Sequence, residues 1–156
     1  MKKGGGRNKG SAFERKVAHM VIRHFCVSPK DCYRTPLSGG HFAASKTDPG
    51  DLVLSPKLVK KFPVSVECKS YRTLDWPKLL FPEINQGHWG KWWKQCVKAS
   101  SGTRHPVLVF QQNRSNIFCL YRQRDFEFSW CRPVLLTTLD KERVNVELFS
   151  TFLQRF

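Results

Sequence analysis

Acidic residues are scarce in this sequence. Its 156 residues include 12 Asp and Glu against 27 Lys and Arg, which gives a formal charge of +15. Such an excess of positive charge makes an anionic partner the expected one, and the backbone of a nucleic acid is the usual case. A basic surface without a specific ligand, or a ribosomal-type tail, is the alternative, but here the basic residues are spread through a globular pattern.

Cysteine pairs, long apolar runs and internal repeats are also missing. The six cysteines include no C-x-x-C pair and lie mostly in apolar segments, so we interpret them as buried free thiols in a reducing cytoplasm. A zinc site that joins Cys26, Cys32 and some of the five histidines is the alternative. No apolar run reaches transmembrane length, and residues 1–10 lack the apolar stretch of a signal peptide, so we expect no membrane partner.

The length of the chain suits one domain with a substantial core and is too short for two ordinary domains. Residues 1–10 are basic and rich in glycine, which predicts a flexible tail that can reach along phosphates. We expect a single folded domain over residues 11–156.

The most informative stretch covers residues 47–70. The turn sequence DPGD at 48–51 precedes a short aliphatic run at 52–54, which predicts a strand that begins beside Asp51. A second run at 64–69 alternates with period two and puts Glu67 and Lys69 on one face. If the two runs pair as a hairpin through the basic connection at 56–62, Asp51 lies near Glu67, and Lys69 points to the same place.

Two carboxylates and one ammonium at such a position suit metal-assisted cleavage of a phosphodiester. Mg²⁺ or Mn²⁺ binds carboxylate oxygens, waters and phosphate oxygens, and the backbone carbonyl of Cys68 is a further candidate ligand. The bound ion activates a water, while a nearby lysine orients that water or stabilises the transition state. The alternative is that Asp51 serves only the turn, while Glu67 and Lys69 are solvated side chains of an edge strand.

The pattern of Asp51 followed by Glu67-x-Lys69 resembles the PD-(D/E)xK nuclease superfamily, and within it the archaeal-type Holliday junction resolvases that are also found in some viruses. Two further segments match in the same order. Residues 8–15 (NKGSAFER) are similar to the KGS-x-x-ER opening of that family, and residues 34–40 (RTPLSGG) to its R-x-P-x-SG loop. The resemblance covers residues 7–70 well and the rest of the chain in outline.

The resemblance implies an α/β fold with a mixed central sheet flanked by helices, of the restriction-endonuclease type. It also implies an Mg²⁺-dependent endonuclease that cuts four-way DNA junctions, with Mn²⁺ as a substitute ion. Symmetric cleavage needs two sites, so a homodimer is implied as well. The expected location is the cytoplasm of a prokaryotic cell, with a viral gene as one origin.

The resemblance further assigns roles to single residues. Asp51 and Glu67 bind the metal with help from Glu14, Lys69 orients or activates the attacking water, and Ser38 contacts the scissile phosphate. The candidates for contacts with nucleic acid are Lys9, Arg15, Arg34, Lys46 and Gln95. Glu14 has a second interpretation, because with Ser11 it also forms a capping box for a helix. For the glutamine near the site, Gln86 is the alternative to Gln95.

Hydrophobic patterns predict the remaining elements. We expect helices at 11–25, at 83–100 with a late start near 87–90, and at 141–156 with Asp140 as its cap. Residues 70–82 are expected to be irregular, and the loop at 36–50 to contact the substrate. Strands are expected at 32–35, 52–54, 64–69, 106–111, 117–121, 126–130 and 134–137.

The second of these helices carries a tryptophan-rich face, which includes Trp89, Trp92 and Trp93. Such a face is most often core or a dimer interface, and the last helix is the other candidate for that interface. Stacking on exposed DNA bases is the alternative, because lysines line the opposite side of the helix.

Three other functions stay open on sequence alone. One is a different nuclease of the same superfamily that acts on flaps, nicks or duplex DNA. Another is a DNA-binding module that retains the fold without catalysis. The third is an RNA-binding protein that uses the basic surface.

Overall fold

The computed structural model describes residues 5–36, 50–81, 86–100, 104–126 and 135–156. The predicted site residues Ser38 and Lys46 lie outside these ranges, as does most of the loop expected at 36–50. Five helices, one 3-10 helix and seven strands are found in the described ranges. In chain order they are α1 (Gly5–Phe25), β1 (Cys32–Arg34), β2 (Leu52–Leu54), α2 (Pro56–Val59), β3 (Val64–Tyr71), α3 (Trp76–Leu80), α4 (Gly87–Ser100), β4 (His105–Gln112), β5 (Ile117–Arg122), η1 (Gln123–Asp125), β6 (Leu135–Leu139), β7 (Glu142–Leu148) and α5 (Phe149–Leu153).

Five strands form one mixed sheet in the order β3-β4-β5-β7-β6. β3 and β4 are parallel, and the other neighbours are antiparallel. A parallel pair requires a crossover connection, and α4 provides it here. β1 and β2 form a separate antiparallel pair. The expected α/β domain with a mixed sheet and flanking helices is confirmed.

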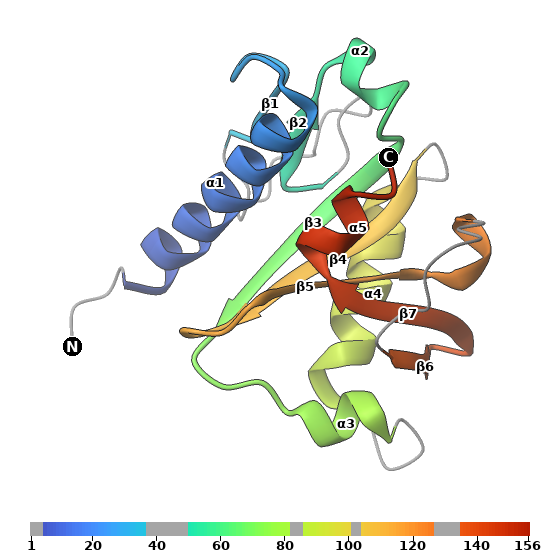
Figure 1. The fold of residues 1–156 in the computed structure, drawn as a ribbon. Coiled ribbons are helices and arrows are strands. Elements are labelled where there is room, and N and C mark those ends of the chain that lie inside the picture. The colour runs from blue at the N-terminus through green and yellow to red at the C-terminus, as the bar shows by residue number, and fades with distance from the viewer. Residues whose placement is uncertain (1–4, 37–49, 82–85, 101–103, 127–134) are drawn as a thin grey trace.

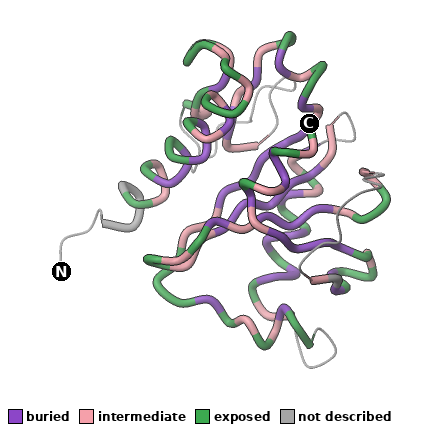
Figure 2. Tube along the Cα trace, viewed as in Figure 1, coloured by how far each residue is buried: buried purple, intermediate pink, exposed green. Residues whose placement is uncertain are grey.

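Helices cover both faces of the sheet. Figure 1 shows α1 and α4 on opposite sides of β3. One apolar cluster joins α1, α2 and α5 to one face, and a second cluster joins α3 and α4 to the other face. The middle strand β4 is therefore buried on both sides, with Val107, Leu108, Val109 and Phe110 all at 0 % exposure, as its continuous apolar sequence predicted. Figure 2 shows this concentration of buried residues along the central strands.

The first helix is longer than predicted. It begins at Gly5, six residues before the expected start, so the flexible tail cannot extend to residue 10. Ser11 then lies inside the helix, and a residue in that position cannot cap the helix N-terminus. The capping-box interpretation of Glu14 is wrong, because its carboxylate instead accepts a hydrogen bond from Arg34 of β1.

The predicted hairpin between residues 52–54 and 64–69 is also wrong. β2 pairs with β1, with Val53 opposite Tyr33, while β3 pairs with β4. The short helix α2 fills the connection between β2 and β3, and Ser55 caps it by accepting a hydrogen bond from the amide of Leu58. Asp51, directly before β2, joins this segment to β3 by donating its backbone N–H to the oxygen of Val66.

The C-terminal helix expected at 141–156 is largely a strand. Asp140 and Lys141 both have positive φ, at 49° and 67°, which is the backbone of a tight two-residue hairpin turn. β6 and β7 pair across that turn, and only α5 is helical. The β-branched residues Val144 and Val146 alternate with polar ones along β7, a period-two pattern that the helical interpretation overlooked.

A buried ion pair fixes α5 against the sheet. Arg155 donates two hydrogen bonds to the carboxylate of Glu147 in β7, at 2.9 and 2.7 Å. Tyr121 donates a third at 2.6 Å. Both charged side chains are almost fully buried, at 5 % and 1 % exposure, so each neutralises a charge that would be costly alone.

Two smaller differences complete the comparison. α3 occupies part of the segment expected to be irregular, and Pro77 stands in its first turn, where proline is tolerated. Most of the strand expected at 126–130 lies outside the described residues. In the described ranges no helix is both long and apolar enough to cross a membrane.

Candidate active site

Gly50 positions the first candidate site residue. Its φ is +95°, and a Cβ at this position would stand 2.5 Å from the backbone oxygen of Val66 in β3. Only glycine permits both the backbone conformation and the close approach. The next residue, Asp51, donates its backbone N–H to the same oxygen at 2.7 Å, so its side chain is placed against β3.

The carboxylate of Asp51 is held by the backbone of β3. Its Oδ2 accepts a hydrogen bond from the amide of Cys68 at 2.7 Å. Thr35, which follows β1, donates its amide to the carbonyl of Asp51 and its hydroxyl to the carbonyl of Gly50, both at 2.9 Å. The aspartate is therefore clamped from two sides, between β1 and β3.

Glu67 and Lys69 lie on one face of β3, as the alternation predicted. Lys69 Nζ donates to Glu67 Oε1 at 2.7 Å. Gln95 of α4 joins this pair, because its Nε2 donates to Glu67 Oε1 at 2.8 Å and its Oε1 accepts from Lys69 Nζ at 3.3 Å. Of the two candidate glutamines, Gln95 is the one at the site, whereas Gln86 bonds the backbone at Thr138 and Asp140.

Asp51 lies close to two other acidic side chains, Glu67 and Glu14, and is affected by their charges. Burial raises the pKa of Asp51 to about 7, and the negative charges of Glu67 and Glu14 add to this rise. The hydrogen bond from Cys68 and the charge of Lys69 oppose it. A carboxyl group whose pKa is raised by burial and by neighbouring carboxylates is one whose ionised form a bound cation would stabilise.

The pKa of Lys69 is also raised, but here the neighbouring negative charges stabilise the charged form. Burial alone would lower the pKa of its ammonium group, but the charge and hydrogen bond of Glu67, with a contribution from Asp51, raise it overall. Lys69 is therefore protonated at neutral pH. Such a group donates hydrogen bonds and stabilises negative charge, and it is unsuited to removing a proton from water.

Glu14 reaches the site from α1. It is buried, with 9 % of its surface exposed, and it is paired with Arg34. Arg34, which was expected to contact nucleic acid, therefore forms an ion pair within the protein that the sequence did not predict. Lys9 and Arg15 are exposed on α1, so their predicted contact with nucleic acid is sterically available.

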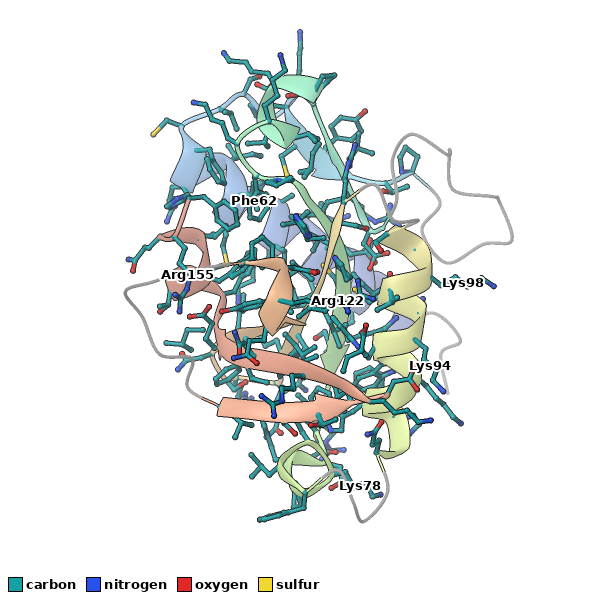
Figure 3. The ribbon with its side chains drawn as sticks, turned by 90° about the vertical axis from the view of Figure 1, so that its right-hand side faces the viewer. Phe62, Lys78, Lys94, Lys98, Arg122 and Arg155 are labelled. Carbon is teal, nitrogen blue, oxygen red and sulfur yellow. The ribbon has the colours of Figure 1, made fainter. Side chains whose placement is uncertain are left out.

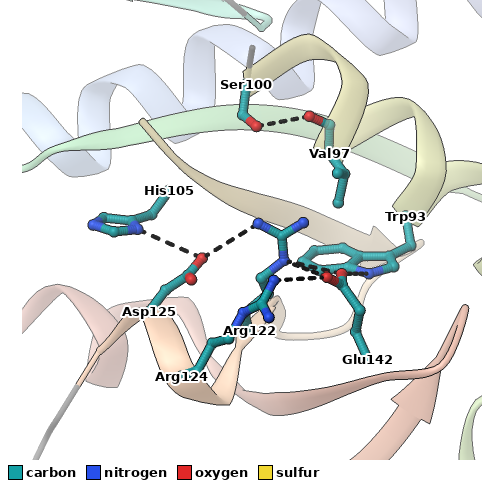
Figure 4. Close-up of polar contacts among 8 residues, drawn as sticks. All are labelled: Trp93, Val97, Ser100, His105, Arg122, Arg124, Asp125 and Glu142. Carbon is teal, nitrogen blue, oxygen red and sulfur yellow. Dashed lines mark hydrogen bonds and ion pairs between the residues drawn. The ribbon is translucent and has the colours of Figure 1, made fainter. Parts of the chain in front are cut away.

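A second polar cluster surrounds Glu142 (Figure 4). Its carboxylate accepts hydrogen bonds from Trp93 at 3.0 Å, Arg122 at 2.9 Å and Arg124 at 3.2 Å. Arg122 also lies 4.0 Å from Asp125. Because these charges pair with one another, we interpret the cluster as a structural link between α4 and the β6-β7 hairpin.

Comparison with known proteins identifies the chain. Residues 5–153 match the model of a family described as "Phage putative PDDEXK endonuclease". The chain belongs to this family. No curated protein and no solved structure matches it.

Membership of the PDDEXK endonuclease family supports nuclease activity for this chain. It also confirms the resemblance to the PD-(D/E)xK superfamily. Nucleases of this superfamily generally use divalent metal ions. The carboxylates of Asp51, Glu67 and Glu14 are suitable oxygen donors for a hard cation, and the charges of Glu67 and Glu14 add to the rise that burial causes in the pKa of Asp51.

In their present positions, however, no three His, Cys, Asp or Glu side chains of the described ranges come together as a metal site. Glu14 is turned to Arg34, and Glu67 is turned to Lys69 and Gln95. A PDDEXK endonuclease with this site would exchange some of these contacts for metal ligation. The alternative zinc site also lacks support within the described ranges, where Cys32 is buried in β1 and Cys26 is exposed after α1.

Sequence reasoning missed two contributors to the geometry of the site. Gly50 was identified only as a turn residue, although the DPGD sequence gave a signal for a special backbone position. The clamp by Thr35 was not foreseen, because it depends on the pairing of β1 with β2.

Proposed function

We propose that this protein is a divalent-metal-dependent endonuclease that selects branched DNA, with the four-way junction as its substrate. Mg²⁺ is the expected ion, and Mn²⁺ is expected to substitute. The observation that carries the proposal is the placement of Asp51 beside the Glu67–Lys69 pair by hydrogen bonds from Cys68 and to Val66.

The chain's own residues would divide the chemistry as follows. Asp51 and Glu67 would hold the metal, with Glu14 in support. The bound ion would supply Lewis acidity and a more acidic water. Lys69, kept protonated, would donate a hydrogen bond to the attacking water or to the charged phosphate in the transition state. Gln95 would keep the Lys69 ammonium directed at the site.

Positive charge around the site would hold the DNA. Figure 3 shows Lys94 and Lys98 extending outward from α4, with Lys78 beyond the start of that helix. Lys9 and Arg15 on α1 are exposed as well. Ser38, Lys46 and Arg34 complete the proposed contacts to phosphate. A net charge of +15 supports binding dominated by the DNA backbone.

A homodimer remains part of the proposal, but its surface cannot be the tryptophan face or the last helix. Trp89 and Trp93 are at 1 % and 0 % exposure within one chain, and Phe149 and Phe152 are both at 0 %. They form core. The exposed apolar side chains at the end of α3, Leu80 and Phe81, are better candidates. The phage family also supports the cytoplasm of an infected prokaryotic cell as the place of action.

The same site would serve a nuclease for flaps, nicks or duplex DNA, which is the second candidate function. A silent DNA-binding module is less well supported, because the chain retains Asp51, Glu67 and Lys69 together. An RNA-binding role would rest on charge alone.

The test is incubation of the purified protein with a labelled four-way junction, the matching duplex and a single strand, in Mg²⁺ and in chelator. Paired symmetric nicks in the junction alone, dependent on metal, are the expected result. The Asp51→Asn variant should bind the junction at least as well and not cut it. Cleavage of all three DNAs would favour the second candidate, and metal-independent binding without cleavage would overturn the proposal.

A further inference from the structure

A pocket lies next to the candidate active site, between the end of β3, α3 and the start of α4. Its volume is about 360 Å³, within the range of sites that hold small molecules. The side chains that matter for its chemistry are Tyr71, Leu74, Asp75, Lys78, His88 and Trp92.

Three aromatic rings form one side of this pocket. The Tyr71 and Trp92 ring centroids are 4.7 Å apart at 32°, and the His88 and Trp92 rings are stacked at 5.6 Å and 17°. Tyr71 is 42 % exposed and His88 is also exposed, whereas Trp92 is buried beneath them. Exposed rings contribute little to the core, but they offer flat surfaces on which a base can stack.

The aromatic surface continues directly from the site residues. Glu67, Lys69 and Tyr71 follow at period two along β3, so they share one face. On α4, Trp92 and Gln95 are three positions apart and therefore neighbours on the helix surface.

Polar groups at the mouth of the pocket suit a nucleotide. Lys78 and Asp75 form an ion pair at 2.7 Å, with side chains 43 % and 48 % exposed. The ammonium can bind a phosphate, and the carboxylate can accept a hydrogen bond from an amino group of a base. Figure 3 places Lys78 beyond the α4 lysines, so a strand that follows these cations would pass the pocket.

We propose that this pocket holds one unpaired nucleobase of the DNA substrate, stacked on Tyr71, next to the phosphate that is cut. The inference rests on the proposed function and adds a recognition element to it. An unpaired base is least costly to expose at a branch, a mismatch or a single strand, so the pocket would favour such DNA over perfect duplex.

The experiment measures affinity in chelator, where no cleavage is needed. The full-length protein, its Tyr71→Ala variant and its Tyr71→Phe variant are titrated with a four-way junction and with copies that carry one abasic nucleotide at successive positions. Tyr33→Ala is the matched control, because Tyr33 is 44 % exposed on β1. Loss of one stacked base corresponds to between about fivefold and about a hundredfold in affinity.

We expect Tyr71→Ala to lose affinity in that range, and Tyr71→Phe and Tyr33→Ala to remain near wild type. One abasic position near the cut should weaken wild-type binding to a similar degree, with no additional loss in Tyr71→Ala. The proposed base-binding pocket would be overturned if Tyr71→Ala left affinity unchanged, or if it reduced affinity equally for every abasic junction. Because affinity is measured without metal, absence of cleavage would overturn the proposed function and leave this result intact.

Discussion

At the scale of single residues, the burial of Asp51 and the charges near it make the stability of the folded chain depend on pH. In the unfolded chain its carboxyl group has the ordinary pKa of 3.8, and in the folded chain its pKa is about 7. Between these values the folded state binds the additional proton, so the free energy of unfolding falls as pH rises. Above pH 7 Asp51 is ionised in both states, and the loss in the free energy of unfolding has reached its full size.

This difference predicts that Asp51→Asn stabilises the metal-free protein at pH 8, by up to about 4 kcal/mol. At pH 4 the variant and the wild type should have nearly equal stability. The measurement is urea unfolding in chelator at both pH values. Asp140→Asn is the control, because Asp140 is an exposed hairpin residue with φ of 49° that asparagine tolerates. Equal pH profiles for wild type and Asp51→Asn would contradict the raised pKa.

Lys69 should affect the rate of cleavage and leave DNA affinity nearly unchanged. Its ammonium is held within the site by Glu67 and Gln95, so under the proposed function Lys69→Ala would remove a donor to the transition state. We expect a loss of about 10²- to 10³-fold in the single-turnover rate, with junction affinity within about threefold. Lys98→Ala on the exposed side of α4 should show the reverse pattern. Weaker binding with an unchanged rate in Lys69→Ala would make it a phosphate contact only.

At the scale of elements, the turn before β2 is the most sensitive connection. Gly50→Ala would drive a Cβ into the Val66 carbonyl at 2.5 Å, at a φ that disfavours any side chain. We expect a loss of about 2 kcal/mol or more in the free energy of unfolding, together with reduced cleavage as Asp51 shifts.

Gly10→Ala is the matched control for this change. Gly10 lies in α1, and the nearest atom to an added Cβ is Glu14 Oε1 at 3.9 Å. Alanine there should stabilise the helix by about 0.5 to 1 kcal/mol. Chemical denaturation of both variants gives the comparison, and a Gly50→Ala protein as stable as wild type would show that the turn can relax.

For the whole molecule, the net charge of +15 predicts a strong dependence of DNA binding on salt. With about six to ten phosphate contacts, affinity should fall by about 10³- to 10⁵-fold between 50 and 200 mM salt. Joint replacement of Lys94 and Lys98 by alanine, the two lysines that extend outward from α4, should reduce the slope of log affinity against log salt by about two. A flat response in the wild type would contradict binding through the backbone.

The sequence alone determined those features that depend on local pattern. Alternation along 64–69 placed Glu67 and Lys69 on one face, and a continuous apolar run marked β4 as the covered middle of the sheet. The DPGD turn located Asp51 at the start of a strand. These inferences succeeded because side-chain direction follows directly from backbone period.

Only the tertiary structure decided which segments meet. β2 pairs with β1 and leaves β3 to β4, although Asp51 still reaches Cys68 through one hydrogen bond. Residues 142–148 carry the period-two pattern of a strand, but only the tertiary structure shows that this strand pairs with β5 on one side and, across the turn at Asp140, with β6 on the other. Strand pairing, the Glu14–Arg34 contact and the rings around Tyr71 all depend on residues far apart in the chain, and local sequence carries little information about such contacts.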